Sequence, residues 1–143
     1  MDNIKLFDAY TAYVFQKIYE NFPKCINFEP LKELKNIQDT TNFSEEEKGI
    51  IFCETMLWLE ENGFLKIKNK IPPTDRPLEP MLYQGFYCVR LTIKGLNLLS
   101  LPKPKTFDKK VGEEIISKVK QGLFTEAGKI ITQSMFEFSK GML

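Results

Sequence analysis

The spacing of apolar positions predicts that helices occupy most of this chain. Residues 3–21 form the clearest case, because Phe7, Tyr10, Val14 and Ile18 recur at helical spacing and make one apolar stripe. Pro23 is expected to stop this helix. Further helices are predicted over residues 29–36, 45–62, 93–99 and about 108–121, with a last one starting near Thr125.

Two short stretches are expected to form strands, and the first of them alternates between apolar and polar residues, as half-buried strands do. They are Phe64–Lys68 and Phe86–Leu91, separated by a loop over 69–85 that contains four prolines. We expect the two to pair as an antiparallel hairpin, and residues 25–28 to form a short extended piece. The fold class predicted from these patterns is mainly α with a small antiparallel β-hairpin, plus two C-terminal helices.

Capping residues predict three helix ends, which belong to two of these helices. Ser44 followed by Glu47 has the capping-box spacing that opens a helix, and Asn62-Gly63 is typical of a helix C-terminus. Thr92 is expected to cap the short helix that follows the second strand. The chain therefore runs from a long capped helix into a strand, a long loop, a second strand and a capped short helix.

This succession resembles a winged-helix domain of the kind found in bacterial regulators. Two segments carry the resemblance, Trp58-Leu-Glu-Glu-Asn-Gly-Phe-Leu65 and Val89-Arg-Leu-Thr-Ile-Lys-Gly-Leu-Asn-Leu-Leu99. The resemblance covers about residues 3–100. It implies a winged-helix-like domain over 1–100. Outside the resemblance, the prolines and apolar spacing predict a Pro/Lys linker over 101–107 and a helical extension over 108–143. Because winged helices serve both DNA recognition and protein docking, the resemblance implies binding and does not choose the ligand.

Charge favours protein over DNA as the ligand. The chain has a formal net charge of +1, so no overall basic field attracts it to nucleic acid. In a winged helix the third helix would enter the major groove, but residues 44–62 hold six glutamates and one lysine. Carboxylates in the first turn stabilise the start of a helix, but they repel the phosphates that line a DNA groove. We therefore expect protein–protein contacts, with DNA-binding regulation as the alternative.

Each ligand class has its own predicted contact residues. If nucleic acid is bound, the expected contacts are Lys66, Lys68, Lys70 and Arg76 in the strand and wing region. If protein is bound, the expected interface is the apolar stripe of the last helix, with Ile131, Met135 and Phe138. The partner would then be another protein or a second copy of this chain. The stripe also fits a helix that folds back onto the chain's own core.

Enzymatic activity is not expected from these residues. The chain has no histidine, which removes the commonest general base and every Ser-His or Cys-His pair. Ser117-Lys-Val-Lys120 matches a serine-lysine motif without its companion motifs, so we interpret it as chance. No cofactor, metal or small-molecule site is expected.

The cysteines and the apolar runs bear on the compartment. Cys25, Cys53 and Cys88 are odd in number and widely spaced, which argues against a disulfide framework and predicts buried thiols in a reducing compartment. No apolar stretch is long enough for a transmembrane helix, and the N-terminus lacks a signal-peptide pattern. The predicted location is the cytoplasm.

Overall fold

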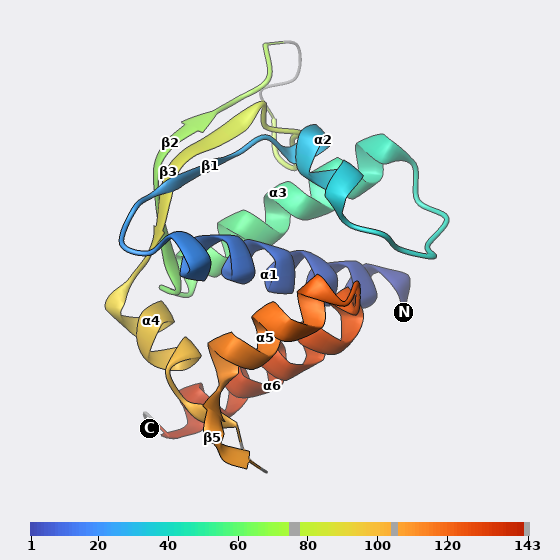
Figure 1. The fold of residues 1–143 in the computed structure, drawn as a ribbon. Helices are drawn as coiled ribbons and strands as arrows, with labels where there is room; N and C mark the ends of the chain where they lie inside the picture. Colours follow the sequence, from blue (N-terminus) through green and yellow to red (C-terminus); the bar gives the residue numbers. More distant parts are fainter. Residues whose placement is uncertain (75–77, 104–105, 142–143) are drawn as a thin grey trace.

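The structure, a computed structural model, describes residues 1–74, 78–103 and 106–141. In chain order the elements are α1 (Asp2–Asn21), β1 (Ile26–Phe28), α2 (Pro30–Glu33), the 3-10 helix η1 (Leu34–Asn36), α3 (Glu45–Glu61), β2 (Leu65–Ile71), β3 (Gly85–Leu91), α4 (Ile93–Leu99), β4 (Pro102–Lys103), β5 (Thr106–Lys110), α5 (Val111–Lys120) and α6 (Phe124–Gly141) (Figure 1). The predicted fold class is confirmed, because helices dominate, β2 and β3 form a small antiparallel hairpin, and two helices follow at the C-terminal end.

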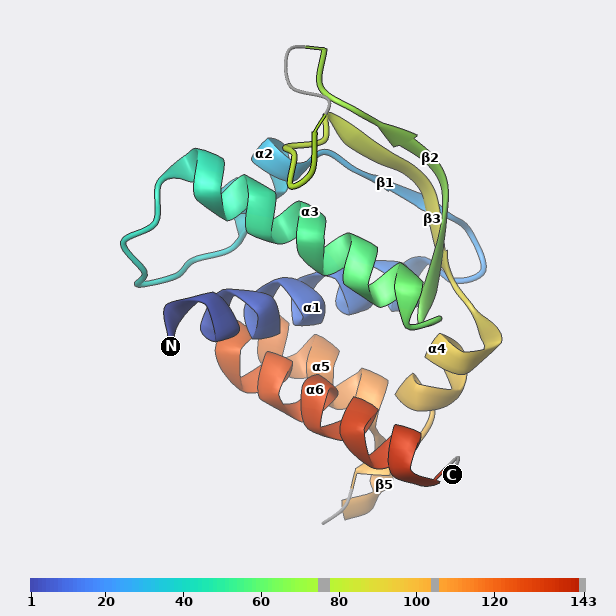
Figure 2. The ribbon, with the colours of Figure 1, turned by 180° about the vertical axis from the view of Figure 1, so that it is seen from behind.

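Helix α1 lies at the centre of the molecule. Helix α3 and the sheet lie on one side of it, and α5 and α6 cover the other side (Figures 1 and 2). Tyr13 of α1 touches both halves, since its ring centroid lies 6.5 Å from that of Phe28 in β1 and 6.4 Å from that of Phe124 in α6. The predicted domain over 1–100 and the predicted extension over 108–143 therefore share one hydrophobic core.

Three antiparallel strands form the main sheet, in the order β1-β3-β2. Leu65 and Ile67 are buried while Lys66 and Lys68 are exposed, as the alternating pattern predicted. The ladder between β2 and β3 runs as far as the pair Ile71↔Gly85, beyond the ends expected from that pattern. The loop predicted over 69–85 is shorter for this reason.

The predicted caps are present with normal geometry. The Ser44 hydroxyl accepts a hydrogen bond from the Glu47 amide at 3.2 Å, and the Thr92 hydroxyl accepts one from the Gly95 amide at 3.0 Å. Gly63 has a φ of +80°, the left-handed conformation that ends α3. These local signals position α3 against the hairpin and α4 after it.

The region after α4 differs from the prediction. Residues 106–110 form β5, which pairs with β4 through Pro102↔Lys110, so α5 begins at Val111 and not at 108. The Val111 amide donates to the Leu101 carbonyl at 2.8 Å and closes this small hairpin. The predicted linker over 101–107 thus contributes to two strands, since the extended backbone that its prolines favour is also the backbone that pairs in a hairpin.

Helix α6 packs directly on α1. A Cβ atom added at Gly128 would lie 2.1 Å from the Asp8 carbonyl oxygen, so this approach requires a glycine. One and two turns further along, Ile131 and Met135 are 0% and 4% exposed. The apolar stripe of the last helix is therefore used in the chain's own core.

A disulfide joins Cys25 to Cys88, which corrects the expectation of buried thiols without a disulfide. The two cysteines are 63 positions apart, and only the pairing of β1 with β3 brings them together. Cys53 is a buried free cysteine, as predicted, and burial raises the pKa of its thiol to about 12.

Within the described ranges, no helix combines the length and apolar character needed to cross a membrane.

Candidate protein-binding groove

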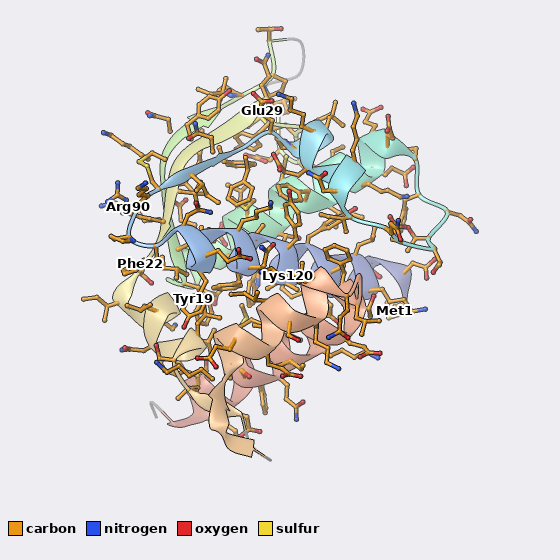
Figure 3. All side chains as sticks on the ribbon, viewed as in Figure 1. Met1, Tyr19, Phe22, Glu29, Arg90 and Lys120 are labelled. Atoms are coloured by element: carbon orange, nitrogen blue, oxygen red, sulfur yellow. A yellow bond between two sulfur atoms is a disulfide. The ribbon has the colours of Figure 1, made fainter. Side chains whose placement is uncertain are left out.

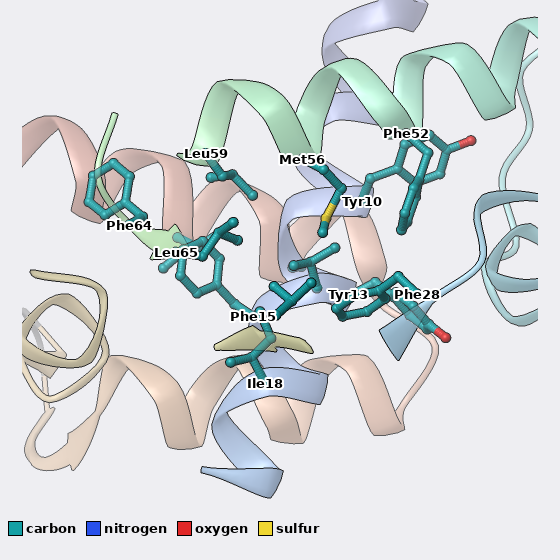
Figure 4. Close-up of a cluster of buried hydrophobic side chains, with 14 of the residues drawn as sticks. Tyr10, Tyr13, Phe15, Ile18, Phe28, Phe52, Met56, Leu59, Phe64 and Leu65 are labelled. Carbon is teal, nitrogen blue, oxygen red and sulfur yellow. The ribbon is translucent and has the colours of Figure 1, made fainter. Parts of the chain in front are cut away.

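Helix α3 carries apolar side chains on two of its faces. The inner face holds Phe52, Met56 and Leu59, each 0% exposed and directed toward α1 and the sheet (Figure 4). The other face holds Ile51 and Leu57, which are partly buried, and Trp58, which is 41% exposed. Ile51 and Leu57 pack partly against the core, whereas Trp58 leaves a large aromatic surface of the helix open to solvent.

The outer apolar residues of α3 line a groove that they share with the first turns of α1. This groove, called the α1/α3 groove below, has a volume of about 500 Å³. Its lining residues are Asn3, Ile4, Phe7, Ile51, Glu54, Thr55, Leu57, Trp58 and Glu61. Phe7 and Trp58 meet edge to face, with ring centroids 5.2 Å apart and planes at 88°. This aromatic pair forms a fixed apolar surface at the groove.

Ile4 and Trp58 present the most accessible apolar surface in the groove. Ile4 is 51% exposed and belongs to α1, while Trp58 belongs to α3. Exposed large aromatic and aliphatic side chains that gather in a concave site are typical of protein-binding hot spots. The groove therefore offers anchor points for apolar side chains of a partner.

The charge of the groove is negative. Glu54 and Glu61 are its only charged lining residues among those the structure describes, and both are exposed. Neighbouring protein atoms displace part of the water around the Glu54 carboxyl and raise its pKa, and the nearby charges of Glu79 and Glu61 raise it further. A cation placed between carboxylates that repel one another in this way stabilises their negative charges.

The acidic start of α3 adds to this negative surface. Glu45, Glu46 and Glu47 are all exposed in the first turn of the helix. Glu60 differs, since it is half-buried and its carboxylate accepts a hydrogen bond from the Ile67 amide at 2.9 Å and pairs with Lys70 at 2.5 Å. The exposed side of α3 is thus anionic along its whole length.

The protein interface predicted on the last helix lies elsewhere and is not exposed. Ile131 and Met135 are buried against the rest of the chain, and Phe138 is partly buried against the same core. The structure thus places the predicted stripe against the chain's own core. In the structure, the last helix folds back onto the chain's own core, which is the alternative stated above.

The predicted nucleic-acid contacts divide into three cases. Lys66 and Lys68 are exposed on β2, and within the described residues neither has an ion-pair partner. Lys70 is held by Glu60. Arg76 lies outside the described residues. Lys66 faces Arg90 across the strand pair, so Lys66, Lys68 and Arg90 make a small cationic surface on the sheet.

The site that pattern reasoning missed is the α1/α3 groove. A sequence signal for it exists, because α3 shows apolar residues on too many faces for a helix that covers a core from one side. Ile4 gives no such signal, since its role depends on the position of α1 beside α3. Over the described residues, no group of histidine, cysteine, aspartate and glutamate is arranged to hold a metal ion.

No protein family model, curated protein or solved structure matches this chain in the comparisons made. The site is therefore interpreted from its own geometry and chemistry.

Proposed function

We propose that this chain is a non-enzymatic, winged-helix-like binding protein that acts through protein–protein contacts at the α1/α3 groove. The observation that carries the proposal is the second apolar face of α3, which leaves Trp58 41% exposed beside an exposed Ile4. The partner that fits is a protein segment with apolar anchor side chains flanked by lysine or arginine.

The chemistry of the groove supports this choice of partner. Apolar anchors would bury the exposed parts of Ile4 and Trp58, which contributes affinity in proportion to the apolar area removed from water. Lysine or arginine beside those anchors would meet Glu54 and Glu61, whose charges would otherwise oppose an acidic partner. An amphipathic helix that lies in a groove commonly uses this combination of contacts.

The winged-helix-like part of the proposal has separate support. The succession α1, β1, α2, α3, β2, β3 leads from helices into a hairpin, and β1 completes a three-stranded antiparallel sheet. This is compatible with the architecture that the two sequence segments resemble. The exposed glutamates of α3 favour a protein as its ligand over a nucleic acid.

Intrinsic fluorescence tests the proposal directly, because Trp58 is the only tryptophan in the chain. The probe is a tryptophan-free amphipathic peptide of leucine and lysine, titrated at physiological salt. Its twin carries glutamate in place of lysine. We expect the leucine/lysine peptide to shift the Trp58 emission to shorter wavelength with micromolar affinity, and the glutamate twin to leave the emission unchanged.

Two matched variants locate the binding. Ile4→Asp places a charge in the groove at an exposed position, and Phe136→Asp makes the same change at an exposed position on α6. We expect Ile4→Asp to weaken peptide binding at least tenfold, and Phe136→Asp to have no effect. Equal binding by both variants, or equal binding of both peptides, contradicts the proposal.

A second candidate function is nucleic-acid binding through the sheet. The observation that favours it is the cationic surface of Lys66, Lys68 and Arg90. Three cations would give weak binding with a modest salt slope, because affinity for duplex DNA grows with the number of neutralised phosphates. Titration of random duplex DNA at low and moderate salt distinguishes the two functions. Tight binding that Lys66→Gln/Lys68→Gln removes would favour this second function.

A further inference from the structure

The Cys25–Cys88 disulfide lies at an irregularity in the sheet. The β1–β3 register passes from Ile26↔Val89 to Phe28↔Phe86, so one residue of β1 faces two residues of β3. Cys88 is one of these two and has a φ of +54°, a conformation that costs energy for a residue other than glycine. Its amide donates to the Asn27 side-chain oxygen at 2.8 Å, which satisfies the extra donor of the bulge.

A cation contacts one of the two sulfur atoms. The Arg90 guanidinium donates to the Cys88 Sγ atom across 3.4 Å, and Arg90 projects from the outside of the sheet (Figure 3). Cys25 and Cys88 are both half-buried, so solvent molecules reach the bridge. A guanidinium beside a sulfur stabilises the negative charge that this sulfur acquires when the bond to it breaks.

We propose that the Cys25–Cys88 bridge is an exchange site for small anionic thiols of the glutathione class, and that Arg90 directs the attack to Cys25. The thiolate of the first molecule attacks the Cys25 Sγ atom, and the Cys25–Cys88 bond breaks. Cys88 leaves as a thiolate beside Arg90, and Cys25 carries the mixed disulfide. A second thiolate attacks the sulfur of the bound small molecule, which releases the oxidised dimer of the small thiol and the Cys25 thiolate. Each protein thiolate then takes up a proton.

The surroundings restrict the reaction to this pair of cysteines. Lys66 faces Arg90 across β2 and β3, so an anionic thiol meets two cations near the bridge. Cys53 does not compete, because it is 0% exposed and its sulfur accepts a hydrogen bond from the Tyr83 amide at 3.3 Å. Reduction removes the covalent link between β1 and β3, and the three-residue strand β1 keeps only its backbone pairing and side-chain packing.

The full-length oxidised protein provides the test. Samples are incubated with glutathione or with the uncharged thiol 2-mercaptoethanol, trapped by alkylation at set times, and analysed by intact mass and peptide mapping. The variants are Arg90→Gln, Arg90→Lys and Lys66→Gln. Lys120→Gln is the control, since Lys120 is exposed at the end of α5 (Figure 3).

The role of Arg90 beside the leaving sulfur and the role of Lys66 in attracting an anionic thiol give different outcomes. Loss of Arg90 should slow reduction by both thiols about threefold or more, because the leaving sulfur loses its cation, and Arg90→Lys should restore part of the rate. Lys66→Gln should slow glutathione alone. In the unmodified protein, the mixed disulfide should map to Cys25.

Three results would overturn the proposal. The first is alkylation of Cys25 and Cys88 before any reductant is added. The second is an unchanged rate for Arg90→Gln when its circular dichroism matches that of the unmodified protein. The third is a mixed disulfide that maps mainly to Cys88.

Discussion

Helices α6 and α3 both carry apolar stripes, but they use them differently. Helix α6 places Ile131 and Met135 in the core against α1. Helix α3 buries one row of apolar residues in the same core, half-buries Ile51 and Leu57 beside it, and leaves Trp58 41% exposed. The comparison shows that an apolar stripe alone does not mark an interface. Apolar residues in excess of one stripe are the better indicator, because the core takes only one face of a helix.

The largest effect that tests this comparison is expected at Ile131. Ile131→Ala removes a fully buried side chain, so we expect the free energy of unfolding to fall by about 3 kcal/mol. Phe136→Ala, at a position 64% exposed on the same helix, should change it by less than about 0.5 kcal/mol. Chemical denaturation measures both. Light scattering of Ile131→Ala should show the same molecular mass as for the unmodified protein. If stability is unchanged and the oligomeric state changes, then α6 forms an interface between molecules.

The next largest effect is expected at Gly128, where α6 packs against the backbone of Asp8 in α1. The added methyl group of Gly128→Ala would lie 2.1 Å from the Asp8 carbonyl oxygen, so the two helices must separate. We expect a loss of about 2 kcal/mol in the free energy of unfolding, in spite of the better helix propensity of alanine. The exposed neighbour Lys129→Ala is the control. A stabilised Gly128→Ala variant would mean that α6 is not held against α1 in solution.

Local signals in the sequence predicted the parts of the fold that depend on neighbouring residues. Ser44, Gly63 and Thr92 act at the ends of α3 and α4 as expected, because a cap needs only residues three or four positions away. The alternation of Leu65 to Lys68 likewise predicted which side of β2 is buried.

Features that depend on distant residues were not predictable in this way. The Cys25–Cys88 bridge joins positions 63 apart and requires β1 to pair with β3. The α1/α3 groove requires Ile4 to lie beside Trp58, which only the packing of the two helices determines. Spacing within the last helix likewise did not show that the chain itself covers Ile131, which is fully buried.

A smaller effect on stability, with a large effect on binding, is expected at Trp58. Its side chain is 41% exposed, so Trp58→Ala should lower the free energy of unfolding by about 1 kcal/mol, less than Ile131→Ala does. Affinity for the leucine/lysine peptide, measured by calorimetry, should fall at least tenfold, as at other aromatic hot spots. The opposite ranking, with Trp58→Ala more destabilising than Ile131→Ala and binding intact, would reverse the roles assigned to α3 and α6.

The smallest effect on stability is expected at Glu54, and its sign depends on pH. The pKa of this carboxyl is raised in the folded state by burial and by Glu79 and Glu61. Its contribution to stability is therefore fully present below the unfolded pKa, and it is lost as the pH rises through the folded pKa. Glu54→Gln should stabilise the protein at pH 7.5 by no more than about 0.5 kcal/mol, because Glu54 is exposed and solvent screens its charge.

The gain in stability from Glu54→Gln should disappear below about pH 4, where the carboxyl is protonated in both the folded and the unfolded state. The same substitution should weaken binding of the leucine/lysine peptide, since the charge that repels Glu61 and Glu79 is the one that attracts a cation. Denaturation at the two pH values and peptide titration at pH 7.5 measure the two effects on one variant. A Glu54→Gln variant could instead be more stable and bind the leucine/lysine peptide as tightly as before. This result would show that the carboxylate repels its neighbours but takes no part in recognition. The basic character assigned to the partner would then be wrong.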